Sequence, residues 1–243
     1  MQRETWILES ARLAGLARVS RWGHYGTPVL LFPSAGGDFE EVERFHLVRA
    51  LAPLIDAGRI KVFSVDGVAA RVWLRGTQSS AECLRTQSAY DAYIDQEVVP
   101  LIRRDLLSDG VEIIAAGAAI GARSAVSCLC RRPDVFRAAL AMSGIFDLSR
   151  FLKSDCPPEP RARSPLHDPP TLEEGIRATR SRRFIQVATG EGEYEDPDDS
   201  RRLASELAAL GIPHRLDLWG PQFAHRWGTW HEMLPRCLAP HVQ

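Results

Sequence analysis

The sequence predicts an α/β fold with a mainly parallel central sheet and helices on both faces, and two patterns predict it. Short apolar runs alternate with longer amphipathic stretches along most of the chain, as in successive β-α-β units. The apolar runs are continuous, as in residues 29–32, and continuous apolar strands are typical of a sheet buried on both sides. The length of 243 residues suits a domain of this kind.

The strands and helices are expected in alternating order. Gly58 should end the first helix, Pro133 follows the third, and Pro100 should bend or interrupt the second. The first 27 residues should form antiparallel strands at one edge of the sheet. Strands are expected at 29–32, 60–65, 111–116, 136–142, 184–188 and 216–219, and helices at 39–56, 80–107, 122–131, 200–210 and 227–238.

One change of composition interrupts this alternation, at about residues 153–170. We expect a single domain, 1–243, that carries this Pro-rich excursion. Its place after a strand and before the next unit suits a lid over a site, and a plain surface excursion explains it equally well. The stretch should be irregular because of its prolines, which are Pro157, Pro158, Pro160, Pro165, Pro169 and Pro170.

Composition excludes several classes of function. The formal net charge of −1 argues against a nucleic-acid binder, which usually has a strongly basic domain or face. No apolar run reaches the roughly 18 residues of a membrane span, and the charged residues within 1–14 do not fit a signal peptide. The sequence is compatible with a homo-oligomer. An odd, scattered set of cysteines predicts reduced thiols in the cytoplasm: Cys83, Cys128, Cys130, Cys156 and Cys237.

Metal and cofactor chemistry is not expected. The seven histidines show no paired ligand spacing, and His231-Glu232 lacks the second histidine of a zinc motif. The glycines between 117 and 121 are not followed by the Lys-Ser/Thr of a phosphate-binding loop, and they do not complete a dinucleotide fingerprint.

A strand, a tight turn of small residues and a helix start follow one another between 111 and 122. This is the form of the nucleophile elbow, Gly-x-Ser-x-Gly, whose glycines let strand and helix approach closely around a strained nucleophile. Gly117 and Gly121 stand at the right spacing, and the middle position is Ala119. Taken alone, this spacing is also explained by close packing of a helix on a sheet.

Three other loops favour the catalytic interpretation. The loop 33–38 is small and glycine-rich, as is required where a backbone amide must approach developing negative charge. His225 lies in the loop after the last strand, where it could act as general base. Glu193, Glu195 and Asp196 lie in an acidic loop that could supply the carboxylate orienting this histidine. The order elbow, acid, histidine is that of α/β-hydrolases.

Four segments together are specific: residues 93–102, the elbow with its helix, residues 141–144, and residues 220–230. In this combination the chain, from about 27 to 238, resembles the putative-esterase family, relatives of S-formylglutathione hydrolase, feruloyl esterases and mycolyltransferases. The resemblance implies an α/β-hydrolase fold. It also implies hydrolysis or transfer of a small or medium acyl group from a carboxylic ester.

The resemblance also implies residue roles. The Ile120 amide and an amide near Gly36 would form the oxyanion hole, and His225 would be the base. Glu195 is the first choice of acid, with Asp196 and Glu193 as alternatives. The residues expected against the substrate are Ser34, Ala35, Ser143 and Trp227.

The sequence departs from the family pattern at Ala119. An alanine methyl cannot attack a carbonyl, and loss of a triad serine costs on the order of 10⁶ in turnover. Ser34 and Ser143 do not stand on the elbow and are poor substitutes. Two accounts stay open: an engineered Ser-to-Ala replacement in an esterase, or a natural pseudo-hydrolase that binds a small molecule or uses His225 for proton transfer.

Overall fold

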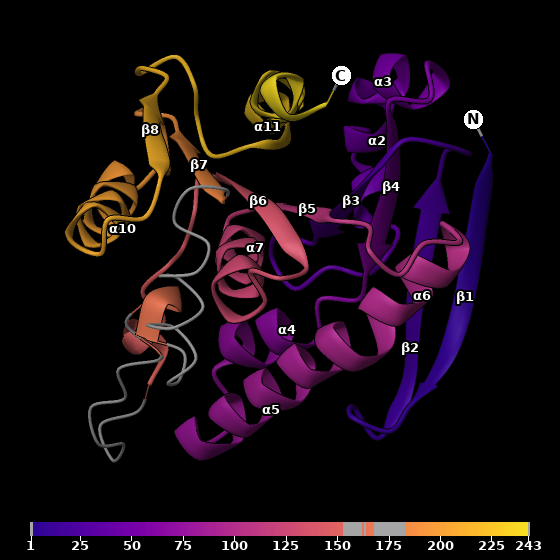
Figure 1. The fold of residues 1–243 in the computed structure, drawn as a ribbon. Coiled ribbons are helices and arrows are strands. Elements are labelled where there is room, and N and C mark those ends of the chain that lie inside the picture. Colours follow the sequence, from indigo (N-terminus) through magenta and orange to yellow (C-terminus); the bar gives the residue numbers. More distant parts are fainter. Residues whose placement is uncertain (1, 153–161, 163, 168–182, 243) are drawn as a thin grey trace.

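The computed structural model describes residues 2–152, 162, 164–167 and 183–242 (Figure 1). Within them lies one eight-stranded sheet with the order β1-β2-β4-β3-β5-β6-β7-β8. From β4 to β8 each neighbouring pair is parallel, whereas β1 pairs with β2, and β2 with β4, in antiparallel fashion. The strands are β1 (Arg3–Ser10), β2 (Gly15–Trp22), β3 (Thr27–Phe32), β4 (Ile60–Val65), β5 (Ile113–Ala118), β6 (Phe136–Met142), β7 (Phe184–Thr189) and β8 (His214–Leu218).

The predicted α/β class, the mainly parallel sheet and the antiparallel edge are confirmed. Every residue of β4 and β5 is buried, because helices cover both faces of the sheet at its centre. One face carries α2 (Leu47–Ala50), α3 (Ala52–Asp56) and α11 (Trp227–Leu238), and the other carries α5 (Ser80–Tyr93), α6 (Val99–Asp105), α7 (Ile120–Arg131) and α10 (Pro197–Ala209) (Figure 1).

Two helical regions differ from the prediction. The single helix expected over 39–56 is three short ones, α1 (Glu41–Arg44), α2 and α3, and His46 between the first two adopts a left-handed φ of 63°. A right-handed helix cannot continue through that conformation. The sequence analysis also did not expect α4 (Val68–Arg75), which follows β4.

The second helix is interrupted as expected near Pro100. A π-helical turn, Ile94–Val98, joins α5 to α6, and Pro100 lies in the first turn of α6. Proline has no amide hydrogen and its ring collides with the carbonyl four residues earlier. A wider turn before it relieves both problems without breaking the helical path. The Pro-rich excursion predicted at 153–170 falls mostly outside the described residues.

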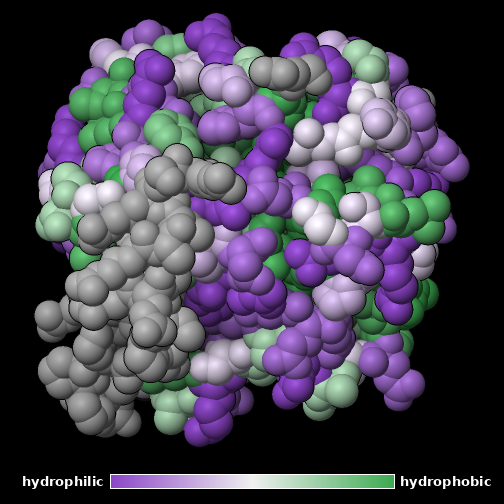
Figure 2. Space-filling view, in the orientation of Figure 1, coloured by the Kyte–Doolittle hydropathy of each residue, from purple (hydrophilic) through white to green (hydrophobic). Residues whose placement is uncertain are grey.

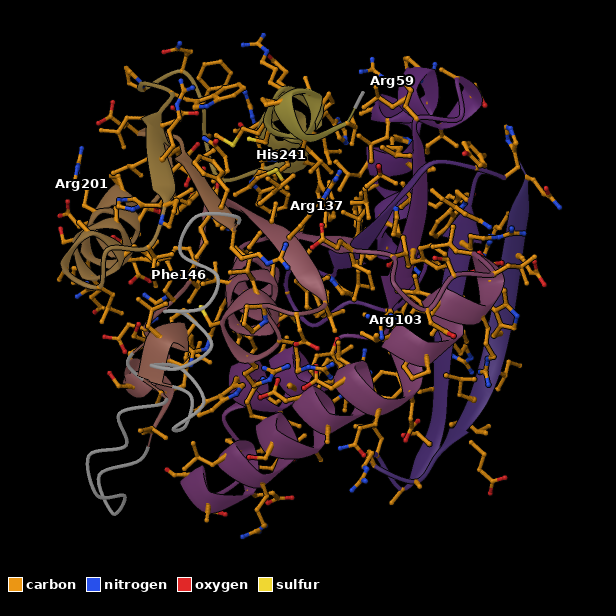
Figure 3. The ribbon with its side chains drawn as sticks, in the orientation of Figure 1. Arg59, Arg103, Arg137, Phe146, Arg201 and His241 are labelled. Atoms are coloured by element: carbon orange, nitrogen blue, oxygen red, sulfur yellow. The ribbon has the colours of Figure 1, made fainter. Side chains whose placement is uncertain are left out.

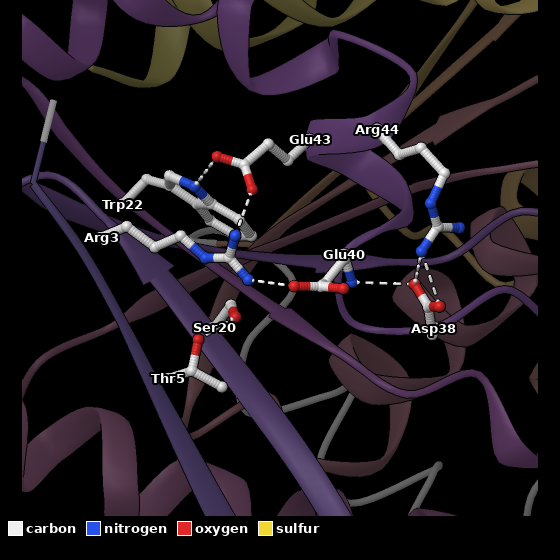
Figure 4. Close-up of polar contacts among 8 residues, drawn as sticks. All are labelled: Arg3, Thr5, Ser20, Trp22, Asp38, Glu40, Glu43 and Arg44. Atoms are coloured by element: carbon white, nitrogen blue, oxygen red, sulfur yellow. Dashed lines mark hydrogen bonds and ion pairs between the residues drawn. The ribbon is translucent and has the colours of Figure 1, made fainter.

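Polar contacts tie the antiparallel edge to the start of α1 (Figure 4). Arg3 pairs with Glu43 at 2.6 Å, and the indole of Trp22 donates to the same carboxylate at 3.0 Å. Arg44 holds Asp38 at 2.7 Å. Burial acts to raise the pKa of Asp38, but the hydrogen bond and charge of Arg44, together with the backbone amides of Glu40 and Glu41, lower this pKa overall. These contacts fix the end of the loop that follows β3.

Two arginines anchor the segment after α11 (Figure 3). Arg59 donates to the carbonyl of Val242 at 2.5 Å, and Arg137 on β6 donates to that of His241. Burial lowers the pKa of His241, and the charge of Arg137 adds to this shift. The C-terminal end of α11 is therefore held against the sheet.

The visible surface is mixed in character. Figure 2 shows hydrophilic side chains spread over the face in view, with apolar ones in small separate groups. In the part of the chain that the structure describes, no helix is both long and apolar enough to cross a bilayer.

Asp199 fixes the turn that follows β6. Its side chain is buried and accepts from the amides of Phe146 at 2.7 Å and Asp147 at 3.3 Å. Arg123 donates to the carbonyl of the same Phe146. The turn is therefore pinned from two helices, because Arg123 lies on α7 and Asp199 on α10.

We expect Asp199→Ala to lower the free energy of unfolding by about 2–4 kcal/mol, because it leaves the buried amide of Phe146 and the half-buried amide of Asp147 without an acceptor. Urea denaturation followed by circular dichroism measures the change. Asp198→Ala is the matched control, since it removes the neighbouring carboxylate, whose side chain is 84% exposed. Equal losses in the two variants would contradict the anchoring role.

Candidate active site

The turn between β5 and α7 has the backbone of a strained elbow. Ala119 adopts φ 53° and ψ −124°, a region that costs a residue with a Cβ on the order of 1–3 kcal/mol. Its amide donates to the carbonyl of Met142 at 3.0 Å, and its carbonyl accepts from the amide of Ile145 at 3.0 Å. The end of β6 therefore holds Ala119 in this conformation.

The two glycines of the elbow are required by close packing. A Cβ on Gly117 would lie 2.4 Å from the carbonyl carbon of Gly121. A Cβ on Gly121 would lie 2.5 Å from the carbonyl oxygen of Pro33. The start of α7 thus rests on β5 and on the end of β3, which brings the elbow beside the loop 33–38.

Arg71 on α4 holds the outer side of the loop 33–38. Its guanidinium donates to the carbonyls of Gly36 at 3.2 Å and Gly37 at 2.9 Å, and the Gly67 amide donates to Gly37 at 2.9 Å. Gly36 has a φ of 74°, and a Cβ there would meet the Arg71 backbone nitrogen at 2.6 Å. These contacts turn two carbonyls of the loop towards α4.

Glu41 binds the same loop at Ser34. Its buried carboxylate accepts from the Ser34 amide at 2.7 Å and from the Ser34 hydroxyl at 3.2 Å. A Cβ on Gly37 would lie 2.2 Å from the Glu41 carboxylate oxygen. Burial raises the pKa of Glu41, although both hydrogen bonds from Ser34 oppose the rise.

Backbone amides at this corner are available to an anion. Ile120 is the first residue of α7, so its amide has no acceptor within the helix and lies at the positive end of the helix dipole. Within the described residues, the amides of Ala35, Gly36 and Gly37 donate to no protein acceptor. Ala35 is exposed. Amides without a protein acceptor are what an oxyanion hole requires, and the assignment of Ile120 and Gly36 to such a hole stays a prediction.

An acid–base pair lies beyond the carboxyl ends of β7 and β8. The Nδ1 atom of His225 lies 3.6 Å from Oε2 of Glu195, whose side chain is only 1% exposed. The hydroxyls of Ser143 and Thr189 donate to the Glu195 carboxylate at 2.6 Å and 3.1 Å. In the described part of the chain, no residue hydrogen-bonds to Nε2 of His225.

The other two candidate carboxylates have different positions. Glu193 is exposed, and its backbone carbonyl, not its side chain, accepts from the His225 amide at 2.9 Å. Asp196 caps α10, with its side chain accepting from the Asp199 amide at 3.3 Å. Of the three, only Glu195 lies within ion-pair distance of His225.

Backbone hydrogen bonds join the acid loop to the histidine loop. Gly190 and Gly192 leave room for this contact, since a Cβ on either would lie within 3 Å of the Phe223 carbonyl oxygen. The two loops therefore behave as one unit that sets the distance from acid to base. The bonds run from Trp219 to Thr189, from Glu191 to Gly220, from Gly192 to Phe223 and from His225 to Glu193.

These features match a known family. The model of the family described as Putative esterase matches residues 23–241. The chain belongs to this family. No curated protein matches the chain in sequence.

Three solved structures show the same fold. The S-formylglutathione hydrolase of Staphylococcus aureus has a TM-score of 0.73 and 12% identity, and the match covers 100% of this chain and 99% of that one. A ferulic acid esterase has a TM-score of 0.69 and 15% identity, and the match covers 98% of this chain and 96% of that one. MPT51 of Mycobacterium tuberculosis has a TM-score of 0.70 and 18% identity, and the match covers 99% of this chain and 97% of that one. At these identities the likeness concerns the fold alone.

The remaining predicted residues of this esterase-family site have the following surroundings. Ser34 and Ser143 are buried, and each hydroxyl donates to a carboxylate. Trp227 is half-buried, stacks on Phe45 with ring centroids 4.8 Å apart, and meets Trp230 edge-on at 5.0 Å.

The sequence analysis missed Glu41, Arg71, Thr189 and Trp230. Trp230 could have been found, because it lies one helical turn after Trp227 and so shares a face with it. The other three show no periodic signal. No group of three or more histidine, cysteine, aspartate or glutamate side chains is placed to hold a metal among the residues that the structure describes.

Gly121→Ala should destabilise the protein by about 1–3 kcal/mol, because its methyl would meet backbone atoms of β3 that cannot move aside. The control is Gly228→Ala in α11, where a Cβ would meet nothing within 4 Å. It should be neutral or stabilising by about 0.5–1 kcal/mol. Thermal and urea unfolding of both variants measure the difference, and a neutral Gly121→Ala would refute the packing argument.

Glu41 gives a pH-dependent prediction. Burial raises its pKa above the ordinary value of 4.5, so the folded protein binds this proton more tightly than the unfolded chain. Its stabilising contribution is complete below the unfolded pKa and is lost as the pH rises through the folded pKa. Glu41→Gln should therefore gain stability relative to the parent between about pH 4 and pH 7. Urea unfolding at both pH values tests this, and a constant difference would contradict it.

Proposed function

We propose that this chain carries the site of a serine carboxylic-ester hydrolase or acyltransferase that lacks only its nucleophile. Ala119 occupies the nucleophile position, His225 is the general base, and Glu195 orients it. The observation that carries this proposal is the backbone of Ala119, with φ 53° and ψ −124°. A plain strand-to-helix junction has no need of that strain, whereas an attacking serine must project from such a turn.

A serine at position 119 would complete a familiar sequence of steps. His225 would take the hydroxyl proton on Nε2 while its Nδ1 faces Glu195. The serine oxygen would attack the ester carbonyl, and the amides of Ile120 and of the Gly36 region would stabilise the resulting oxyanion. His225 would then return the proton to the leaving alcohol. Water would release the acyl group by the same route in reverse.

The substrate proposed for this site is a small-molecule ester. Membership of the Putative esterase family supports that class. The names of two structural neighbours, an S-formylglutathione hydrolase and a ferulic acid esterase, support it as well. Ala35 is exposed beside the proposed hole and Trp227 is half-exposed next to Trp230, so both can line the substrate.

With alanine at position 119 the chain forms no acyl-enzyme, whether the alanine was engineered or arose naturally. The hydroxyls of Ser34 and Ser143 do not replace it, because each is buried and donates its proton to a carboxylate. A second candidate function follows, in which the intact pocket binds a small molecule or His225 transfers a proton without a covalent step. Its free Nε2 favours that alternative.

A cytoplasmic location is proposed on the cysteines. Cys128 and Cys237 are buried free thiols, which fits a reducing compartment. Cys83 and Cys130 are buried as well. Cys156 lies outside the described residues.

Ala119→Ser should hydrolyse an activated short-chain ester at least about 10³ times faster than the parent. This expected gain in rate is smaller than the factor of about 10⁶ by which loss of a triad serine lowers turnover. A fluorophosphonate probe should label the variant covalently. Adding His225→Ala should abolish both signals. Steady-state rates on a series of acyl chain lengths, with mass spectrometry of the labelled protein, measure the outcome.

The matched control is Ala118→Ser, which adds the same oxygen one residue before the nucleophile position and should stay inactive and unlabelled. A folded Ala119→Ser protein with neither activity nor labelling would sink the proposal. The binding or proton-transfer candidate would then be favoured.

A further inference from the structure

The hydroxyl of Ser143 joins two parts of the site that the sequence separates widely. It lies 3.0 Å from the indole nitrogen of Trp230 and 2.6 Å from Oε1 of Glu195. Ser143 is 3% exposed and Trp230 4% exposed. Both hydrogen bonds are therefore shielded from water, where such bonds are stronger and more directional than at the surface.

Chemistry fixes the direction of both bonds. An indole nitrogen can only donate, so the Ser143 oxygen accepts from Trp230. The Ser143 proton is then free to point at Oε1 of Glu195, an ionised carboxylate being acceptor only. The Thr189 hydroxyl lies 3.1 Å from Oε2, and Nδ1 of His225 lies 3.6 Å from that same oxygen. The carboxylate is held at both oxygens.

Trp230 also contacts the ring of His225. Its ring centroid lies 5.2 Å from that of His225 with the planes at 87°, an edge-to-face contact. One indole therefore touches the base directly and holds the acid through Ser143. Rotation of His225 away from Glu195 would have to break the ring contact with Trp230.

The backbone of Ser143 is held in a costly conformation. Its φ is 45°, in the left-handed region that residues with a Cβ rarely adopt. Its amide donates to the carbonyl of Ala188 at 2.7 Å, which ties the end of β6 to β7. Strain of this kind persists only where the surroundings over-determine it, and it clusters at functional sites.

We propose that Ser143 and Trp230 are positioning residues that fix the Glu195–His225 pair. Through them Oε2 faces Nδ1, so neutral His225 carries its proton on Nδ1 and leaves Nε2 free to act as base. The inference rests on the proposed function in taking His225 as the base. The tautomer of His225, however, is a property of the chain as it stands with Ala119.

Two-bond ¹H–¹⁵N spectra of the full-length chain read that tautomer. They are recorded well above the ordinary histidine pKa of about 6.5, where imidazoles are neutral. His225→Gln assigns the signals. In the parent, His225 should show the Nδ1–H form. Ser143→Ala should move it towards the Nε2–H form, and Trp230→Phe, which keeps the ring and removes the donor, should move it the same way by less.

The matched control is Ser64→Ala, which removes another fully buried serine hydroxyl, on β4, that has no hydrogen-bond partner among the described residues. Its spectrum should equal that of the parent. A parent with the proton on Nε2 would overturn the proposal. The proposal would also be overturned if the tautomer of His225 were unchanged in both Ser143→Ala and Trp230→Phe. The same holds if Ser64→Ala shifted the tautomer as much as Ser143→Ala does. If Ser143→Ala does not fold, Trp230→Phe decides.

Kinetics in the Ala119→Ser background separate this inference from the proposed function. Adding Ser143→Ala should lower kcat by about 10-fold to 10²-fold, the scale of a misplaced catalytic group, and leave KM within about twofold. If Ala119→Ser is inactive while the tautomer shifts as expected, the proposed function fails and the positioning role stands. An unchanged kcat in an active background overturns the positioning role alone.

Discussion

The site depends on how the backbone at Ala119 is held. The amide of Ala119 donates to the last residue of β6 and its carbonyl accepts from Ile145, so the neighbouring strand imposes the left-handed φ from outside. Two glycines let α7 approach β5 and β3 closely enough for the turn to close. None of these contacts uses the side chain at position 119. The elbow therefore keeps its form, and aims the Ile120 amide, with or without a nucleophile.

The parallel sheet then brings the other groups to the same edge. The oxyanion loop follows β3, Ser143 follows β6, the acid loop follows β7 and the histidine loop follows β8. Because β3 and β6 flank β5, their loops border the elbow directly. The more distant β7 and β8 loops reach it because backbone hydrogen bonds join them into one unit, and α11 supplies Trp230 from the face of the sheet that also packs against Ala119.

The pattern of apolar residues along the sequence predicted the strands whose burial produces that pattern. Continuous apolar runs located β3 to β7. The order of the loops indicated His225 and an acidic loop with Glu193, Glu195 and Asp196 as candidates for the proposed site. The break at His46, the π-helical form of the interruption near Pro100 and the φ of Ser143 escaped prediction. The φ of Ser143 accompanies a hydrogen bond from its amide to the carbonyl of Ala188, which is far away in the chain. The roles of Glu41 and Arg71 also escaped prediction, because these residues bind the loop 33–38 from two different helices. The choice among Glu193, Glu195 and Asp196 required the fold, since only there does burial distinguish them.

The energetics of the acid–base pair bear on what the site does without a serine. The strained backbone of Ala119 supports the proposed elbow, and the buried carboxylate near His225 supports the proposed acid. A buried carboxylate loses hydration that only good partners offset. The side chain of Glu195 is 1% exposed, and its partners are the hydroxyls of Ser143 and Thr189 and, at 3.6 Å, Nδ1 of His225. A hydrophobic residue of similar size would fill that space at lower cost. The cost of burying this carboxylate supports the proposed role of Glu195, which is to hold His225 in one tautomer.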